Sequence, residues 1–152
     1  MPRRSELSSL ESHLGYWIRY VSNHVSHAFA LKLAAVGVTA AEWVVLRELY
    51  DSESAPSALA DRLGMTRGAI SKLADRLIDK ALIVRRISAG DRSFQSLALT
   101  RHGRAITPKL AALADENDAE FFADLDSETR ARIAAAMKTI VRSKGLRGAP
   151  VD

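Results

Sequence analysis

The sequence predicts a mostly α-helical protein with one small β-hairpin. Apolar residues recur at three- and four-residue spacing along most of the chain, which is the period of a helix face. Only the stretch around residues 82–99 has a strand–turn–strand composition. With 152 residues, of which 47% are hydrophobic and 26% charged, the chain suits a single globular domain.

The longest predicted helix covers residues 8–35. Its apolar face repeats at helical spacing and consists of Leu10, Leu14, Ile18, Val21, Val25 and Ala28. Gly37 follows as a stop signal. Thr39 and Glu42 then form a capping-box pattern, in which the threonine side chain accepts from a free amide and the glutamate reaches back. This pattern starts a second helix over residues 40–50.

Two shorter helices follow and form a helix-turn-helix. Pro56 suits the first position of a helix over residues 56–63, and Gly64 suits the left-handed position that ends it. Thr66 is a natural N-cap for the next helix, residues 67–80. The inward face of that helix consists of Ile70, Leu73, Ala74 and Leu77. Two helices joined by so short a turn have the form of a helix-turn-helix motif.

The rest of the chain is predicted to hold a hairpin and two helices. Residues 82–87 and 94–99 form the strands of the hairpin, whose turn carries a basic tip. A helix over residues 100–123 follows, with a kink at Pro108. The last helix covers residues 128–144. A helix-turn-helix followed by a two-stranded hairpin is a winged helix.

The charge distribution favours a polyanionic partner. The chain has 22 basic and 18 acidic residues, but residues 62–104 hold ten basic and three acidic ones, a formal charge of +7 that leaves the rest at −3. Such a basic segment favours nucleic acid as the partner. The alternative is a solvated basic face with no partner. The absence of cysteine excludes disulfides, cysteine-ligated zinc sites, Fe–S clusters and thiol nucleophiles.

Several stretches of the chain form a recognisable set in their order and spacing: Leu59–Leu63, Thr66–Leu73 and Asp75–Leu77 in the helix-turn-helix, and Asp91–Thr100 with Gly103 at the wing. In these stretches the sequence resembles the MarR family of multiple antibiotic resistance regulators. The resemblance implies a single MarR-like domain over residues 1–152. Its expected parts are a winged helix-turn-helix, residues 39–100, and a helical dimerisation region, residues 8–35 and 101–145.

Two positions depart from the family pattern. The wing usually has Asp-any-Arg, whereas here Ser93 occupies the third position and Arg92 lies one place earlier. We therefore expect a weaker contribution from the wing tip. The turn after the fourth helix commonly has glycine after its lysine, but here Ala81 follows Lys80. A positive φ at Ala81 would cost about 1 kcal/mol.

The fourth helix is the predicted DNA-reading element, because a helix fits the major groove. The positions opposite its buried face are Arg67, Gly68, Ser71, Lys72, Asp75 and Arg76. Thr66 and the nearby amides of the helix N-terminus can hold a phosphate. In the wing, Arg85 and Arg86 point to opposite faces, so we expect only one of them, Arg86, to reach DNA. Arg92, at the hairpin tip, is the candidate for the minor groove.

The first two helices carry a candidate ligand site. Trp17, Tyr20 and His24 lie on an aromatic stripe of the first helix, and Trp43 and Arg47 lie four residues apart on the second. Together they would line an apolar cleft with a few polar groups, as small-molecule sites do. Arg47 would pair with the carboxylate of a small aromatic or phenolic acid. The alternative is that these aromatics belong to the core and the dimer interface.

The predicted function is a homodimeric, sequence-specific transcriptional regulator that binds double-stranded DNA at a pseudo-palindromic operator. The resemblance implies a repressor that a small aromatic or phenolic acid releases from DNA. The alternative is a metal-responsive regulator of the same fold that uses His13, His24 or His27. No nucleophile–base pair, phosphate loop or paired acidic motif indicates an enzyme, and we expect no cofactor. No run of about 18 apolar residues and no secretory signal is present, so we expect a cytoplasmic protein with no membrane partner.

Overall fold

A computed structural model describes residues 7–87, 90 and 95–148. This part of the chain is mostly helical with one two-stranded antiparallel hairpin, which confirms the predicted fold class. Its elements, in chain order, are η1 (Leu10–Ser12), α1 (Leu14–Ala34), α2 (Ala40–Asp51), α3 (Pro56–Leu63), α4 (Arg67–Asp79), β1 (Ile83–Ile87), β2 (Gln95–Leu99), α5 (Arg101–Phe122) and α6 (Ser127–Ser143).

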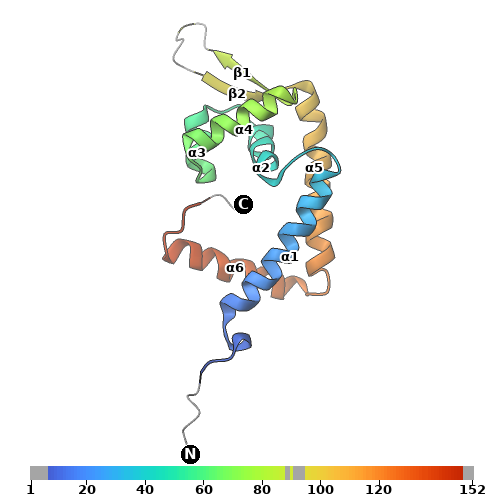
Figure 1. The fold of residues 1–152 in the computed structure, drawn as a ribbon, viewed down its shortest axis with the longest axis vertical. Coiled ribbons are helices and arrows are strands. Elements are labelled where there is room, and N and C mark those ends of the chain that lie inside the picture. The colour runs from blue at the N-terminus through green and yellow to red at the C-terminus, as the bar shows by residue number, and fades with distance from the viewer. Residues whose placement is uncertain (1–6, 88–89, 91–94, 149–152) are drawn as a thin grey trace, which may run out of the picture.

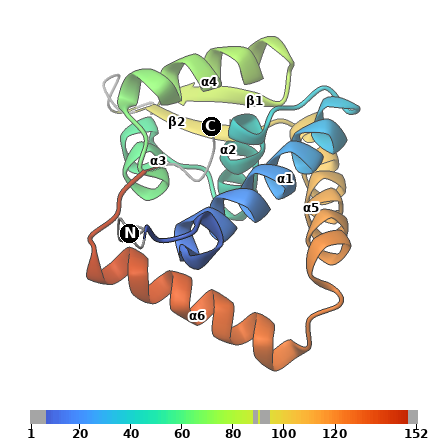
Figure 2. The same ribbon diagram turned by 60° about the horizontal axis from the view of Figure 1, so that its bottom comes forward.

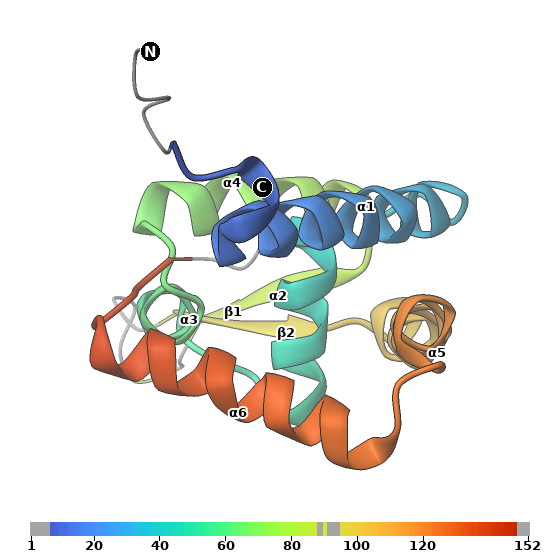
Figure 3. The same ribbon diagram turned by 90° about the horizontal axis from the view of Figure 1, so that it is seen from below.

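The elements form a compact lobe and a set of longer helices that extend from it (Figure 1). The lobe contains α2, α3, α4 and the hairpin, and α4 lies along its outer edge with the hairpin beside it (Figure 2). Helices α1 and α5 pack against each other and lead away from the lobe. Helix α6 crosses at the far end of α5, on the near side when the molecule is seen from below (Figure 3).

One hydrophobic core holds the lobe together. Its largest members are fully buried and come from five elements of the lobe and from α1 and α5. They are Leu33, Leu46, Leu49, Leu59, Ile70, Leu77, Ile83, Leu97 and Leu110. Burying one such side chain contributes roughly 1.5–3 kcal/mol, so this cluster is the main source of stability for the lobe.

The first helix begins later than the sequence predicts. Residues 8–35 were expected to form one helix, but α1 starts at Leu14, after a separate 3-10 turn and an extended residue, His13 (φ −91°, ψ 122°). The Ser12 hydroxyl donates to the Ser9 carbonyl over 2.7 Å, and His13 Nδ1 lies 2.8 Å from the same oxygen. Side chains that bond nearby backbone compete with helical hydrogen bonds, which accounts for the break.

The predicted caps and the turn of the helix-turn-helix are confirmed. The Thr39 hydroxyl accepts from the Glu42 amide over 3.1 Å, and Glu42 Oε1 accepts from the Thr39 amide over 3.0 Å, so both halves of the capping box form. Gly64 ends α3 with φ +65°, and the Thr66 side chain caps α4. At Pro108, where the sequence predicts a kink, the helix is not interrupted: α5 is one helix that contains this proline.

Helix α4 ends in a turn that requires a positive φ at an alanine. The Ala81 amide donates to the Ile78 carbonyl over 2.8 Å, and the Leu82 amide donates to the Leu77 carbonyl over 2.9 Å. This pair of bonds defines a Schellman motif, which glycine usually completes. Ala81 has φ +59° and is the one non-glycine residue with positive φ in the ranges given above. The positive φ at Ala81, whose cost was considered from the sequence, is therefore present.

Gly103 allows α5 to begin directly against this turn. A Cβ atom on Gly103 would lie 2.0 Å from the carbonyl oxygen of Leu82, which is too close for any side chain. The same oxygen accepts a hydrogen bond from the Thr100 amide over 3.0 Å, so it cannot simply move away. The close approach connects the end of α4 to the first turn of α5.

We expect Ala81→Gly to raise the free energy of unfolding by roughly 0.5–1 kcal/mol. Glycine removes the left-handed strain of about 1–2 kcal/mol but adds unfolded-state entropy. Urea denaturation at fixed protein concentration measures the change. Ala105→Gly, at an exposed interior position of α5, is the matched control and should cost about 1 kcal/mol. Equal losses for both variants would contradict the strain at Ala81.

We expect Gly103→Ala to lower the free energy of unfolding by about 1–3 kcal/mol, because the new methyl group overpacks a backbone contact. Thermal unfolding followed by circular dichroism measures the loss. Gly15→Ala in α1 is the control: a Cβ atom there meets nothing within 4 Å, so this variant should gain up to about 1 kcal/mol. An unchanged stability for Gly103→Ala would show that the turn can yield.

Candidate nucleic-acid interface

Helix α4 has one buried face and one exposed face. Its apolar residues Ile70, Leu73 and Leu77 are buried in the core. All the predicted groove-facing residues are exposed, and the structure brings them together on the outer face of the helix: Thr66, Arg67, Gly68, Ser71, Lys72, Asp75 and Arg76. The outer face is therefore polar, predominantly basic and free of the core.

The N-terminus of α4 is also open to solvent. The Thr66 hydroxyl accepts from the Ala69 amide over 3.1 Å, so it caps the helix. The earlier amides, those of Arg67 and Gly68, have no helical carbonyl to bond. Gly68 adds no side chain above them. Free amides and the positive end of the helix dipole make this terminus suitable for a phosphate oxygen.

Around the outer face, the basic residues of the segment 62–104 divide into paired and unpaired ones. Arg62 Nε lies 3.1 Å from Glu48 Oε2, and its Nη2 donates to Ser54 Oγ over 2.7 Å. The Arg104 guanidinium stacks on the Tyr50 ring at 5.1 Å from its centroid. These arginines hold α2, α3 and α5 together.

Both arginines of β1 face a carboxylate. Arg85 Nη2 donates to Asp75 Oδ1 of α4 over 2.9 Å. Arg86 Nη1 lies 3.8 Å from Glu53 Oε2, a looser contact, and its side chain is 62% exposed. The pair between Arg85 and Asp75 was missed from the sequence, because ten residues and a turn separate them. It leaves Arg86 as the more available arginine of the two.

The remaining cations of α4 are unpaired within the part of the chain that the structure describes. Arg67, Lys72 and Arg76 form no ion pair there, although four other basic residues of the segment do. Asp75, one of the two exposed carboxylates of α4, is occupied by Arg85, and the other, Asp79, lies in the last turn, so the positive charge is concentrated over the earlier turns. Unpaired cations at an exposed helix face are suited to a polyanion.

The hairpin has a third backbone partner that the sequence did not predict. Strands β1 and β2 pair from Ile83 with Leu99 to Ile87 with Gln95. Ser54, in the loop between α2 and α3, forms an isolated bridge with Leu97. Its amide and carbonyl bond Leu97 over 3.1 and 2.8 Å. A single-residue bridge leaves no periodic pattern in the sequence. The predicted tip residues Arg92 and Ser93 lie outside the described residues.

The predicted ligand residues fall into two separate groups. Trp17, Tyr20 and His24 form an exposed row on α1, with the Tyr20 and His24 rings stacked at 5.2 Å. Trp43 packs against the core, and Arg47 Nη1 forms an ion pair with Asp51 Oδ2 over 3.0 Å. Within one chain, the structure does not bring the α1 row and Arg47 into one cleft.

Arg47 lines an open pocket of about 330 Å³ between α2 and α5. The described residues around it are Arg47, Tyr50, Asp51, Thr107, Pro108, Ala111, Ala112 and Asp115. Its lining combines apolar residues with one basic and two acidic side chains. Such a mixture suits a small polar ligand better than a purely apolar one.

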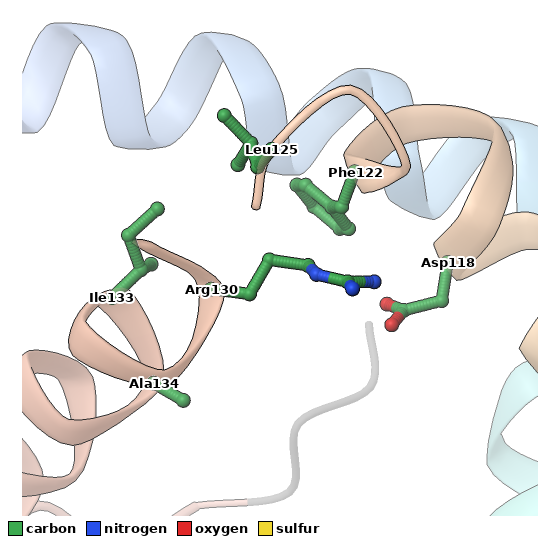
Figure 4. Close-up of a pocket in the computed structure, with 6 residues that line it drawn as sticks. All are labelled: Asp118, Phe122, Leu125, Arg130, Ile133 and Ala134. Carbon is green, nitrogen blue, oxygen red and sulfur yellow. The ribbon is translucent and has the colours of Figure 1, made fainter. Parts of the chain in front are cut away.

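A second apolar pocket lies at the corner between α5 and α6 (Figure 4). It has a volume of about 200 Å³, and in it the guanidinium of Arg130 points toward the carboxylate of Asp118. Helix α6 has no buried residue in the single chain. Its predicted apolar stripe is 36–47% exposed and consists of Ile133, Met137, Ile140 and Val141. The helical region thus leaves a large apolar surface uncovered.

The described residues contain no group of three or more His, Asp or Glu side chains arranged to hold a metal ion. The ring of His24 stacks on Tyr20, and His13 Nδ1 contacts the Ser9 carbonyl. No described helix is long and apolar enough to cross a membrane.

The comparison with known proteins agrees with this architecture. A model of the MarR family matches residues 36–92, which contain the helix-turn-helix and β1. The sequence matches no curated protein. The fold is similar to a mutant of MarR from E. coli complexed with operator DNA, with 24% identity, coverage of 84% of this chain and 93% of that chain, and a TM-score of 0.76.

Two further solved structures share the fold at a TM-score of 0.78. One is CouR from Rhodococcus jostii bound to p-coumaroyl-CoA, with 20% identity over 88% of this chain and 95% of that chain. The other is BpsR from Bordetella bronchiseptica, whose DNA binding is regulated by 6-hydroxynicotinic acid, with 19% identity over 88% and 96%. Residues 36–92 therefore match the MarR family model, and the chain has the fold of MarR-family regulators along most of its length.

Proposed function

We propose that the protein is a homodimeric, sequence-specific transcriptional regulator that binds double-stranded DNA through α4 and the wing. The observation that carries this proposal is the unpaired positive charge on the exposed face of α4, beside basic residues that carboxylates already neutralise. The similar fold of a MarR mutant complexed with operator DNA supports the same assignment. The proposal needs no catalytic group.

The residues of the interface divide by the group they can reach. Arg67, Ser71 and Lys72 lie on the exposed face of α4, where side chains can bond base edges in the major groove. Thr66, Gly68 and the helix N-terminus would receive a phosphate. Arg76, one turn further along, would contact the phosphate backbone, and Arg86 and Arg92 would contribute from the wing.

The dimer follows from the apolar surface that the single chain leaves exposed. On α1, Leu14, Ile18 and Val21 are 39–68% exposed, and the stripe of α6 is similarly uncovered. An isolated helix is marginally stable in water, so α6 needs a partner surface. A second copy would supply one. On this basis residues 39–100 form the DNA-binding part, and residues 8–35 and 101–145 form the dimerisation region of one domain that spans residues 1–152.

We propose that a small aromatic or phenolic acid releases this repressor from DNA. Arg47 is the anchor for the carboxylate, which would replace Asp51 as the partner of the guanidinium. The exposed Trp17, Tyr20 and His24, together with Trp43, would enclose the ring once the dimer forms. The regulation of BpsR by 6-hydroxynicotinic acid supports this class of ligand. Release requires that the ligand bind the DNA-free conformation better, by roughly 1–3 kcal/mol for typical coupling.

We expect Arg67→Ala to weaken binding to an operator selected from random duplexes by about 1–3 kcal/mol and to relax the preference at one base pair, because a bidentate contact to a base is lost. Fluorescence anisotropy on single-base variants of the operator measures both effects. Arg132→Ala is the control, since Arg132 lies on α6 and pairs with Glu128. Unchanged operator binding by Arg67→Ala would contradict the role of α4.

We expect Arg47→Ala to weaken the binding of salicylate or 6-hydroxynicotinate about tenfold or more, because a charge-assisted hydrogen bond is lost. Asp51→Asn should have the opposite effect, since it frees the guanidinium from its internal partner. Calorimetric titration of the two variants and the wild type measures these changes. Equal affinities in all three proteins would remove Arg47 and the proposed ligand site from the account.

A further inference from the structure

We propose that Lys80 is a positioning residue that fixes the recognition helix α4 in its DNA-binding orientation, without contacting DNA itself. The inference rests on the proposed DNA binding and adds a residue that this function did not include. Lys80 is basic and caps the C-terminal end of α4, so from charge alone it would be taken for a phosphate contact.

The Lys80 side chain is 39% exposed, but its ammonium bonds groups at the end of α1 and the start of α2. Its Nζ atom donates to Glu42 Oε1 over 2.9 Å and to the Gly37 carbonyl over 2.8 Å. Glu42 lies in the first turn of α2, and Gly37 lies in the turn that follows α1. One side chain therefore joins the end of α1, the start of α2 and the end of α4.

The buried carboxylate of Glu42 makes the removal of Lys80 unfavourable. The Glu42 side chain is fully buried, and Lys80 Nζ lies 2.9 Å from its second oxygen, Oε2, as well. Burial raises the pKa of Glu42, but hydrogen bonds from Lys80 and Thr39 outweigh it, so the pKa is below its usual value. The group is thus a carboxylate at neutral pH. A buried carboxylate whose cation is removed is left uncompensated, which is unfavourable.

The Lys80 contact constrains the direction of α4, which the apolar core does not. Burial of Ile70, Leu73 and Leu77 holds α4 against the lobe, but hydrophobic contacts have no preferred direction. The hydrogen bonds of Lys80 do have one, and they act at the end of the helix opposite Arg67. Because 13 residues span about 20 Å, a tilt of about 5° at Lys80 would displace the N-terminus of α4 by nearly 2 Å.

This placement distinguishes two roles for Lys80 in DNA binding. A lysine that contacts phosphate releases counterions, so its removal lowers the dependence of binding on salt. A lysine that positions the helix releases none. Its removal should weaken binding to the operator, where base contacts require the correct orientation, and should leave binding to random DNA unchanged.

Lys80→Met tests the proposal against Arg76→Met, which removes an unpaired cation from the exposed face of the same helix. Affinities for the operator and for a random duplex are measured over a series of salt concentrations. We expect Lys80→Met to weaken operator binding about fivefold or more, equivalent to one lost base contact. Its salt slope should stay that of the wild type, whereas Arg76→Met should lower the slope by about 0.9 per subunit.

The double variant Glu42→Gln/Lys80→Met covers the case in which the single variant does not fold, because it leaves no buried charge and glutamine still completes the capping box. We expect the same loss of operator preference from it, and a return toward wild type in Lys80→Arg. A salt slope lowered as in Arg76→Met would make Lys80 a phosphate contact and overturn the proposal. Unchanged operator preference in the double variant would overturn it as well. If the wild type binds no duplex, the proposed function itself fails.

Discussion

The burial of Ile70, Leu73 and Leu77 is the constraint on which the account of this protein depends. These residues fix which side of α4 faces the core, so they also decide which side chains face outward. The N-cap at Thr66 and the turn at Ala81 set where the helix begins and ends. Every role proposed for the outer face follows from that orientation, since a rotation by half a turn would bury the cations and expose the leucines.

The basic residues of the lobe differ in whether they have a partner within the chain. Arg62, Arg85 and Lys80 are each held by a carboxylate, and Arg104 stacks on an aromatic ring. These residues serve the architecture, because they connect helices and strands that would otherwise meet only through apolar contacts. The cations left over are concentrated on α4. The formal charge of residues 62–104 is therefore larger than the charge that a partner can reach. The unpaired cations show where on the surface that reachable charge lies.

The sequence predicted those features that depend on neighbours in the chain. Helical periodicity, the capping box of Thr39 and Glu42, and the left-handed residue Gly64 are all local, and the structure confirms them. Two contacts join segments about 40 residues apart: the ion pair between Lys80 and Glu42, and the bridge at Ser54. No local sequence pattern predicts contacts of this kind. The aromatic row of α1 remains apart from Arg47 in one chain, because its proposed completion needs a second subunit.

Chemical protection of the operator tests most directly whether the outer face of α4 enters the major groove. Dimethyl sulfate methylates guanine N7 in the major groove and adenine N3 in the minor groove, so it distinguishes the two. On an operator selected by the purified protein, we expect protection of guanine N7 in two half-sites about one helical turn, or a multiple of it, apart. Reactive guanine N7 throughout the site, with protection confined to adenine N3, would contradict the account.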